Sequence, residues 1–160
     1  MSEEKKEKVA LIVMSGEMER LFGAFIIATG AAASGLDVSM FFTFWGLRAI
    51  KSDKRTGRSF LGRLIGFMEK GGINRATPGH YSFFGLGRWL FYRMMKRHRL
   101  PTLTELRQMA IDLGVKFYGC EMSLQVMEIP REALIPEVQA CVGVAHFLAI
   151  AKEAAITLFI

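Results

Sequence analysis

One thiol in this chain stands where a strand-like run of residues meets a helix-like run. In the stretch VKFYGCEMSLQVMEI, residues 115–129, Cys120 follows an apolar, aromatic segment and precedes a segment with helical character. If a helix begins directly after it, the backbone N–H groups and the helix dipole would stabilise a thiolate and lower its pKa below about 8.5. Such a thiol is nucleophilic near neutral pH. The competing interpretation is a small buried apolar side chain, and the neighbouring carboxylate of Glu121 disfavours the anion.

The elements that must position this thiol follow a regular alternation. Continuous apolar runs predict strands buried on both faces, and runs with helical spacing that end at glycine predict the helices between them. Strands are expected over 7–16, 36–46, 115–120, 137–143 and 155–160, and helices over 17–35, 102–114, 121–127 and 143–154. This order predicts right-handed βαβ crossovers and a flavodoxin-like, three-layer α/β fold with about five mostly parallel strands. Because reactive groups collect at the carboxyl ends of such strands, we expect Cys120 to be exposed at that edge.

Length and composition limit the architecture. The chain has 160 residues, 51% hydrophobic and 22% charged, which predicts a single domain over 1–160. Two cysteines make no disulfide framework, and no signal-peptide pattern precedes the first apolar run, so a cytoplasmic location is expected. No apolar run reaches the roughly 18 residues that a membrane span needs.

One segment, at about 50–101, interrupts the alternation and reads as an insertion without strands. The stretch 48–107 carries a net charge of +11, whereas the rest of the chain carries −5. The insertion is also rich in glycine, aromatic residues and methionine. All the positive excess of the protein therefore lies in and around this segment.

Several segments together resemble the DsrE/DsrF/DsrH-like family of small sulfur-handling proteins. They are KVALIVMSGEMERLFGAFIIATGAAASG, VSMFFTFWGL, LTELRQMAIDLGVKFYGCEMSLQVMEI and VQACVGVAHFLAIAKEAAITLFI. The most specific part is YGCEMS, which is similar to the Cys-x-Met-Ser segment of a branch with a long insertion after the second strand. The resemblance implies a cytoplasmic, oligomeric protein whose cysteine accepts and passes on sulfur as a persulfide or thiosulfonate. The reactive cysteine of the family corresponds to Cys120.

Other residues could line or support this site. We expect Ser15 and Gly16, at the end of the first strand, to help line the thiol's pocket with Met122 and Ser123 of the motif, although a turn explains the first two equally well. Cys141 lies in a predicted buried strand, which favours core packing over a role as a resolving or second sulfur-bearing thiol.

Metal and nucleotide sites are not predicted. His80 and His98 lie in the insertion and His146 lies in an apolar helix, so with two distant cysteines they lack the spacing of zinc ligands. No G-x-G-x-x-G or P-loop pattern occurs, and no cofactor is expected.

The basic insertion admits several interpretations. It could attract anionic sulfur donors or an acidic carrier protein as a lid over Cys120, contact an anionic membrane surface, or form an oligomer interface. Specific nucleic-acid binding is not expected, because no recognition motif accompanies the charge. Its basic surface is best defined by Arg93, Lys96, Arg97 and Arg99. A homo-oligomer is expected because the apolar content of the insertion exceeds what one small domain can cover.

The resemblance, together with the position of Cys120, thus predicts a sulfur-relay protein with Cys120 as the accepting thiol, and donor and acceptor proteins or small anionic sulfur species as partners. The alternative is a non-catalytic, oligomeric binding or assembly protein in which Cys120 is structural. Such a protein could also contact the membrane surface.

Overall fold

The fold is built on a five-stranded, fully parallel sheet. The computed structural model describes residues 7–54, 56–68, 72–79 and 86–160. The strands are β1 (Lys8–Val13), β2 (Asp37–Phe42), β3 (Lys116–Cys120), β4 (Val138–Val142) and β5 (Ile156–Phe159), in the order β4-β3-β2-β1-β5. Because all strands run the same way, their carboxyl ends meet at one edge of the sheet. Cys120 is the last residue of β3 and lies at that edge.

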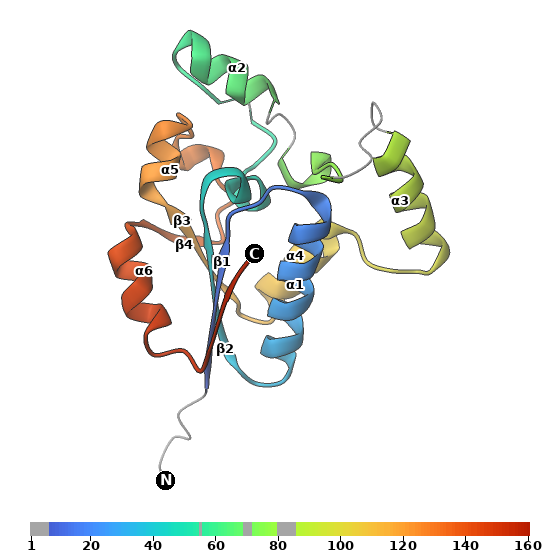
Figure 1. The fold of residues 1–160 in the computed structure, drawn as a ribbon, viewed down its shortest axis with the longest axis vertical. Coiled ribbons are helices and arrows are strands. Elements are labelled where there is room, and N and C mark those ends of the chain that lie inside the picture. The colour runs from blue at the N-terminus through green and yellow to red at the C-terminus, as the bar shows by residue number, and fades with distance from the viewer. Residues whose placement is uncertain (1–6, 55, 69–71, 80–85) are drawn as a thin grey trace.

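Helices cover both faces of the sheet (Figure 1). On one face lie α1 (Met18–Ala33) and α4 (Leu103–Asp112), and on the other lies α6 (Val144–Ala151), with α5 (Glu121–Val126) above it at the carboxyl edge. The predicted three-layer α/β fold is therefore confirmed. The strand expected over 36–46 is too long, since β2 ends at Phe42 and a 3₁₀ segment, η1 (Phe44–Ile50), follows. That segment turns back on the first strand, where the N–H of Gly46 donates to the carbonyl of Met14 at 2.8 Å.

The strand side chains divide between two apolar clusters, as the alternation of strand side chains requires. The larger cluster lies under α1 and α4 and includes Phe25, Phe42 and Phe117, whose rings meet at tilted or edge-on angles. The smaller cluster lies under α6, where Phe41 and Phe147 stack with ring centroids 4.7 Å apart. Burial of both sheet faces explains why the strands read as continuous apolar runs.

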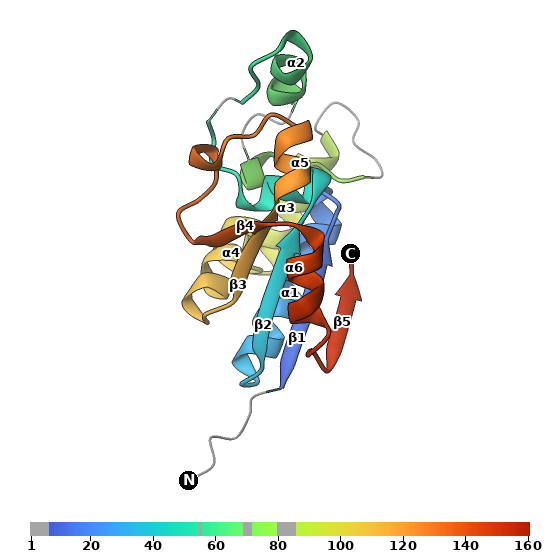
Figure 2. The ribbon, with the colours of Figure 1, turned by 90° about the vertical axis from the view of Figure 1, so that its left-hand side faces the viewer.

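The insertion forms helices and no strand over its described residues. Its elements are α2 (Phe60–Met68), η2 (Gly72–Arg75) and α3 (Leu86–Arg97). In Figure 2, α2 stands above α5, beyond the carboxyl edge of the sheet, while α3 lies on the side of α1 in Figure 1. The Phe22 and Phe91 rings, with centroids 5.9 Å apart, join α1 to α3. The two helices of the insertion thus lie over different parts of the domain.

Among the residues that the structure describes, none of the helices combines the length and the apolar character that crossing a membrane requires.

Candidate functional site

Cys120 occupies the junction between a central strand and a short helix. It is the final residue of β3 and the N-cap of α5, so the chain turns directly at the thiol. Its side chain belongs to the smaller apolar cluster with Phe41 and Phe147, and the residue is only 4% exposed. The expectation of a thiol exposed at the strand end is therefore wrong. The reason is that α6 packs on this face of the sheet, where its residues Phe147 and Ala151 belong to the same buried cluster as Cys120.

One buried and one partly buried hydroxyl group accompany the thiol. Ser123 lies in the first turn of α5 and is fully buried, and Thr43 follows the end of the neighbouring strand β2. Their side-chain oxygens are 2.8 Å apart. The N–H of Thr43 donates to the carbonyl of Val13 at 3.0 Å, which holds this residue against the end of β1. The hydroxyls of Thr43 and Ser123 thus lie together beside Cys120, at the carboxyl ends of β1, β2 and β3. The other neighbours of the thiol are apolar.

This environment acts on the pKa of Cys120 in two directions. Burial raises the pKa of the thiol, but the hydroxyl and then the backbone N–H of Ser123 lower it. The hydroxyl of Thr43 and the backbone N–H of Met122 act in the same direction, and the net pKa is below its ordinary value. The sulfur makes no capping hydrogen bond with the first turn of α5. These donors therefore act as longer polar contacts, which favour the thiolate over the thiol.

The two hydroxyls have a simple proton balance. Each carries one proton, and either one can donate to the other across the 2.8 Å contact. In both arrangements one hydroxyl proton remains for the sulfur of Cys120. The hydrogen bond between the two hydroxyls polarises the one that donates to the sulfur. This strengthens its contact with the Cys120 thiolate. Thr43 and Ser123 thus act as a unit.

Cys141 packs against the larger apolar cluster, as core packing predicts, but it is less buried than predicted. It lies on β4, an edge strand, and is only partly buried. It lines a surface cavity of about 400 Å³ together with side chains of α5 and the segment that follows. The expected burial in a strand interior is therefore wrong, because no strand covers the outer side of β4.

The two thiols lie on opposite faces of the sheet. Cys141 pairs with Gly119 in the β3–β4 ladder, and a Cβ added at Gly119 would lie 3.5 Å from the Cys141 sulfur. Cys120 pairs with Val142, which belongs to the cluster under α6. Cys141 packs instead against the larger cluster. In this arrangement Cys141 does not face Cys120.

Ser15 and Gly16 follow β1 at the same edge of the sheet but adjoin another hollow. They line a space of about 210 Å³ with Trp45 and Arg48, and Cys120 is not part of its lining. The Ser15 hydroxyl accepts a hydrogen bond from the N–H of Glu17 at 3.1 Å. A Cβ on Gly16 would lie 2.6 Å from the carbonyl oxygen of Trp45, so a larger residue does not fit. The structure brings Ser123 to the thiol but keeps these two residues apart from it.

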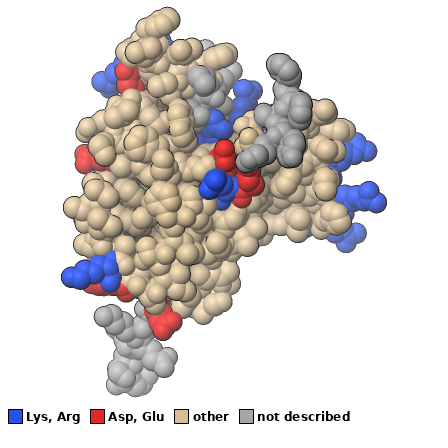
Figure 3. All heavy atoms as spheres, in the orientation of Figure 1, with Lys and Arg blue, Asp and Glu red and all other residues tan. Residues whose placement is uncertain are grey.

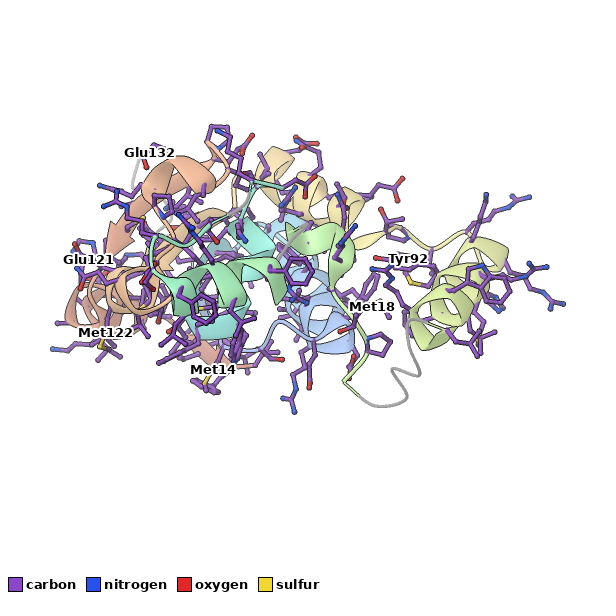
Figure 4. The ribbon with its side chains drawn as sticks, turned by 90° about the horizontal axis from the view of Figure 1, so that it is seen from above. Met14, Met18, Tyr92, Glu121, Met122 and Glu132 are labelled. Atoms are coloured by element: carbon purple, nitrogen blue, oxygen red, sulfur yellow. The ribbon has the colours of Figure 1, made fainter. Side chains whose placement is uncertain are left out.

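Met122 contributes through its backbone rather than its side chain. Its N–H lowers the Cys120 pKa, while the side chain is 59% exposed. Seen from above the carboxyl edge in Figure 4, Met122 and Glu121 project from α5 at the end of the molecule opposite Tyr92 of α3.

The predicted basic surface is exposed but lies away from the thiol. Arg93, Lys96 and Arg97 belong to α3, Arg99 follows it, and all four are exposed. In Figure 3, Lys and Arg side chains gather on the side of the molecule where α3 lies. Because α3 packs on the α1 side of the sheet, the structure gives no support for these residues as a lid over Cys120.

Of the insertion helices α2 and α3, α2 is the one held beside α5, and one carboxylate anchors it. Glu128, in the turn after α5, accepts hydrogen bonds from the backbone N–H groups of Arg58 and Ser59, the latter at 2.7 Å. The Ser59 hydroxyl and these N–H groups hold the pKa of Glu128 below its usual value. A Cβ on Gly62 would collide with this carboxylate, so α2 approaches closely because position 62 is glycine.

Sequence reasoning missed Thr43, Glu128 and Phe147 as parts of the site. Thr43 was detectable in principle, because a strand ending at Phe42 would place it at the carboxyl edge beside Cys120. Glu128 and Phe147 carry no such signal, since their roles depend on how α2 and α6 pack. In the described part of the chain, no three His, Cys, Asp or Glu side chains cluster as metal ligands would.

The fold and the site define a small α/β protein with a thiol of lowered pKa at the carboxyl edge of a parallel sheet. The chain belongs to the DsrE/DsrF/DrsH-like family, whose model matches residues 5–159. It is 31% identical over 98% of its length to the uncharacterized protein YrkE of Bacillus subtilis, of which it covers 99%. It is 29% identical, over 98% of its length and 99% of the relative's, to the sulfur carrier protein DsrE2 of Allochromatium vinosum. The crystal structure of ychN from E. coli has the same fold, with a TM-score of 0.59, 13% identity and coverage of 96% of this chain and 99% of that one.

Proposed function

We propose that this protein is a sulfur-relay protein and that Cys120 is the thiol that accepts and passes on sulfur. The observation that supports this most is the position of Cys120 beside the paired hydroxyls of Thr43 and Ser123, which lower its pKa at the edge where α/β proteins place reactive groups. The full-length similarity to a named sulfur carrier supports the same function. Partners would be sulfur-donating and sulfur-accepting proteins or small anionic sulfur species, and the cytoplasm is the proposed location.

The proposed step is an exchange at sulfur that needs no added oxidant. The Cys120 thiolate attacks the outer sulfur of a donor persulfide or a polysulfide, and a new S–S bond forms at Sγ. The S–S bond of the donor breaks, and its electron pair leaves with the donor as a thiolate or shortened polysulfide, which takes up a proton. With tetrathionate, the thiolate attacks one of the two central sulfurs, the central S–S bond breaks, and Cys120 keeps a thiosulfonate while thiosulfate leaves with the electron pair. The reverse exchange with an acceptor thiolate returns Cys120 to its starting state.

Burial sets the condition for this exchange. Cys120 is 4% exposed, so a donor reaches it only when α5 or α6 moves away from the end of β3. A persulfide held behind Phe147 would be shielded from stray thiols, which otherwise remove its outer sulfur readily. Restricted access thus fits a carrier that releases sulfur only to a partner able to open the site.

A second candidate function is binding or assembly without sulfur chemistry, with Cys120 as a structural residue. Its support is the exposed apolar surface of α2, where Phe60, Leu61 and Phe67 are 84%, 68% and 69% exposed. Isolated surface residues of this kind need no explanation, but a row of them on one protruding helix favours a partner. A second copy of the chain or a membrane surface would cover this helix, and either agrees with the burial of the thiol.

The experiment that separates the two functions is chemical mapping on the unmodified protein. The folded protein is exposed to polysulfide or to tetrathionate, digested, and its cysteine peptides are identified by mass spectrometry. We expect added sulfur, or a thiosulfonate, on the peptide that contains Cys120. Adducts restricted to Cys141, or none under either treatment, would exclude the relay in the form proposed.

The hydroxyl pair leads to a prediction about pH. Hydrogen bonds to the anion favour the charged form, so Ser123→Ala should raise the Cys120 pKa, and less thiolate is then present near neutral pH. Thr43→Val should raise it less, and the double variant should shift it by less than the sum because the hydroxyls act as a unit. The ultraviolet absorbance of the thiolate, titrated in a Cys141→Ser background, measures these shifts. An unchanged titration of Ser123→Ala would show that this hydroxyl does not act on the sulfur.

A further inference from the structure

The cavity beside Cys141 has the composition of a ligand site and is separate from the proposed relay site. Its volume is about 400 Å³, within the roughly 300 to 1,000 Å³ of small-molecule sites. Cys141 and Arg131 also line a second hollow, of about 320 Å³. The thiol and the arginine are shared by the two hollows, which together we call the groove, and each hollow is larger than a small inorganic sulfur ion requires.

The charges around this groove are of both signs. The cavity is lined by Arg58, Arg131, Glu121 and Glu128, and the second hollow adds Glu132. The Glu128 carboxylate already accepts hydrogen bonds from two backbone N–H groups and a hydroxyl at the start of α2, and Arg58 lies near enough to lower its pKa. Two guanidinium groups and the carboxylates of Glu121 and Glu132 are therefore available to a ligand. Arginine favours carboxylate partners, since its planar fork matches them.

We propose that the groove binds a peptide-sized thiol with two carboxylates and one amine, as its disulfide, and that Cys141 exchanges with it. The two carboxylates would face Arg58 and Arg131, and the ammonium group would face Glu121. Leu124 and Ile129 supply an apolar floor, as small-molecule sites commonly have.

The covalent step is thiol–disulfide exchange. Cys141 loses its proton to solvent, and its thiolate attacks one sulfur of the ligand disulfide to form a mixed disulfide. The ligand S–S bond breaks, and the second half leaves as a thiolate that takes up a proton. The ligand disulfide is the oxidant. Cys120 takes no part, because it lies on the opposite face of the sheet.

The test uses two disulfides on the full-length protein. Glutathione disulfide carries the charges that the groove would recognise, and 2-hydroxyethyl disulfide is an uncharged probe of the same reaction. Mass spectrometry follows both adducts with time in the parent and in Cys120→Ser and Cys141→Ser variants. We expect a glutathionyl adduct on Cys141 that survives Cys120→Ser and is lost in Cys141→Ser. Survival in Cys120→Ser makes this result independent of the relay function.

Recognition is tested by the ratio of the two rates. The Arg58→Gln/Arg131→Gln double variant should lower the glutathione disulfide rate about tenfold relative to the 2-hydroxyethyl disulfide rate, as expected for losing charge-assisted contacts. The matched control is Arg93→Gln/Arg97→Gln, which removes the same charge from α3 on the other side of the domain. An unchanged ratio in the groove variant, an equal fall in the control, or an adduct confined to Cys120 would overturn the proposal.

Discussion

Replacing Cys120 by serine is expected to abolish the sulfur loading that survives a brief exposure to a small thiol, while Cys141→Ser leaves this protected loading by polysulfide largely intact. The serine hydroxyl is not ionised near neutral pH and does not form a stable bond to the outer sulfur. The substitution retains the small volume at the end of β3 and an N-cap oxygen for α5, so the fold should persist. The measurement is the amount of added sulfur per protein chain, determined by mass spectrometry of the folded protein.

The Cys141→Ser variant controls for adducts that arise from accessibility alone. Cys141 is the more exposed thiol and reacts with any small reagent that enters its groove. Sulfur that Cys141 holds should be removed by a brief exposure to a small thiol, whereas sulfur on Cys120 should persist because Phe147 and α6 cover it. Full loading of Cys120→Ser that resists such exposure would refute the relay through Cys120.

The second large effect concerns the cover over the thiol. Phe147 is fully buried and stacks on Phe41 in the small cluster that contains Cys120. Phe147→Ala should lower the free energy of unfolding by about 3 to 5 kcal/mol, because a cavity remains under α6. It should also raise the alkylation rate of Cys120 more than about tenfold, since the thiol then borders that cavity. Denaturant unfolding and timed alkylation in a Cys141→Ser background measure the two effects.

A matched variant separates local opening from general destabilisation. Phe25 is equally buried, but it packs in the larger cluster under α1, on the other face of the sheet. Phe25→Ala should cost a similar free energy and leave the alkylation of the folded protein nearly unchanged. Equal acceleration in both variants would mean that the reagent reaches Cys120 through global unfolding. If Phe147→Ala is too unstable to purify, Phe147→Leu gives a smaller cavity and a smaller change in the same direction.

The sequence by itself determined the alternation of strands and helices and the place of Cys120 within it. Apolar runs such as 7–16 predicted strands buried on both faces, and a capping box of Thr102 and Glu105 starts α4 where a helix over 102–114 was predicted. These are local properties, because backbone conformation and capping depend on neighbouring residues. The motif around Cys120 likewise indicated a strand that ends where a helix begins, as the structure has it.

Only the tertiary structure decided which thiol is covered and where the insertion lies. Cys120 is buried because α6, which begins 24 residues later, packs over its strand, and Cys141 is partly open because β4 became an edge strand. The charge of the insertion was evident from composition, but Phe91 directs α3 toward α1, and Glu128 holds α2 near α5. Burial and proximity depend on strand order and on contacts between distant segments. Side-chain periodicity carries no information about either, because it reports only which face of its own element a residue occupies.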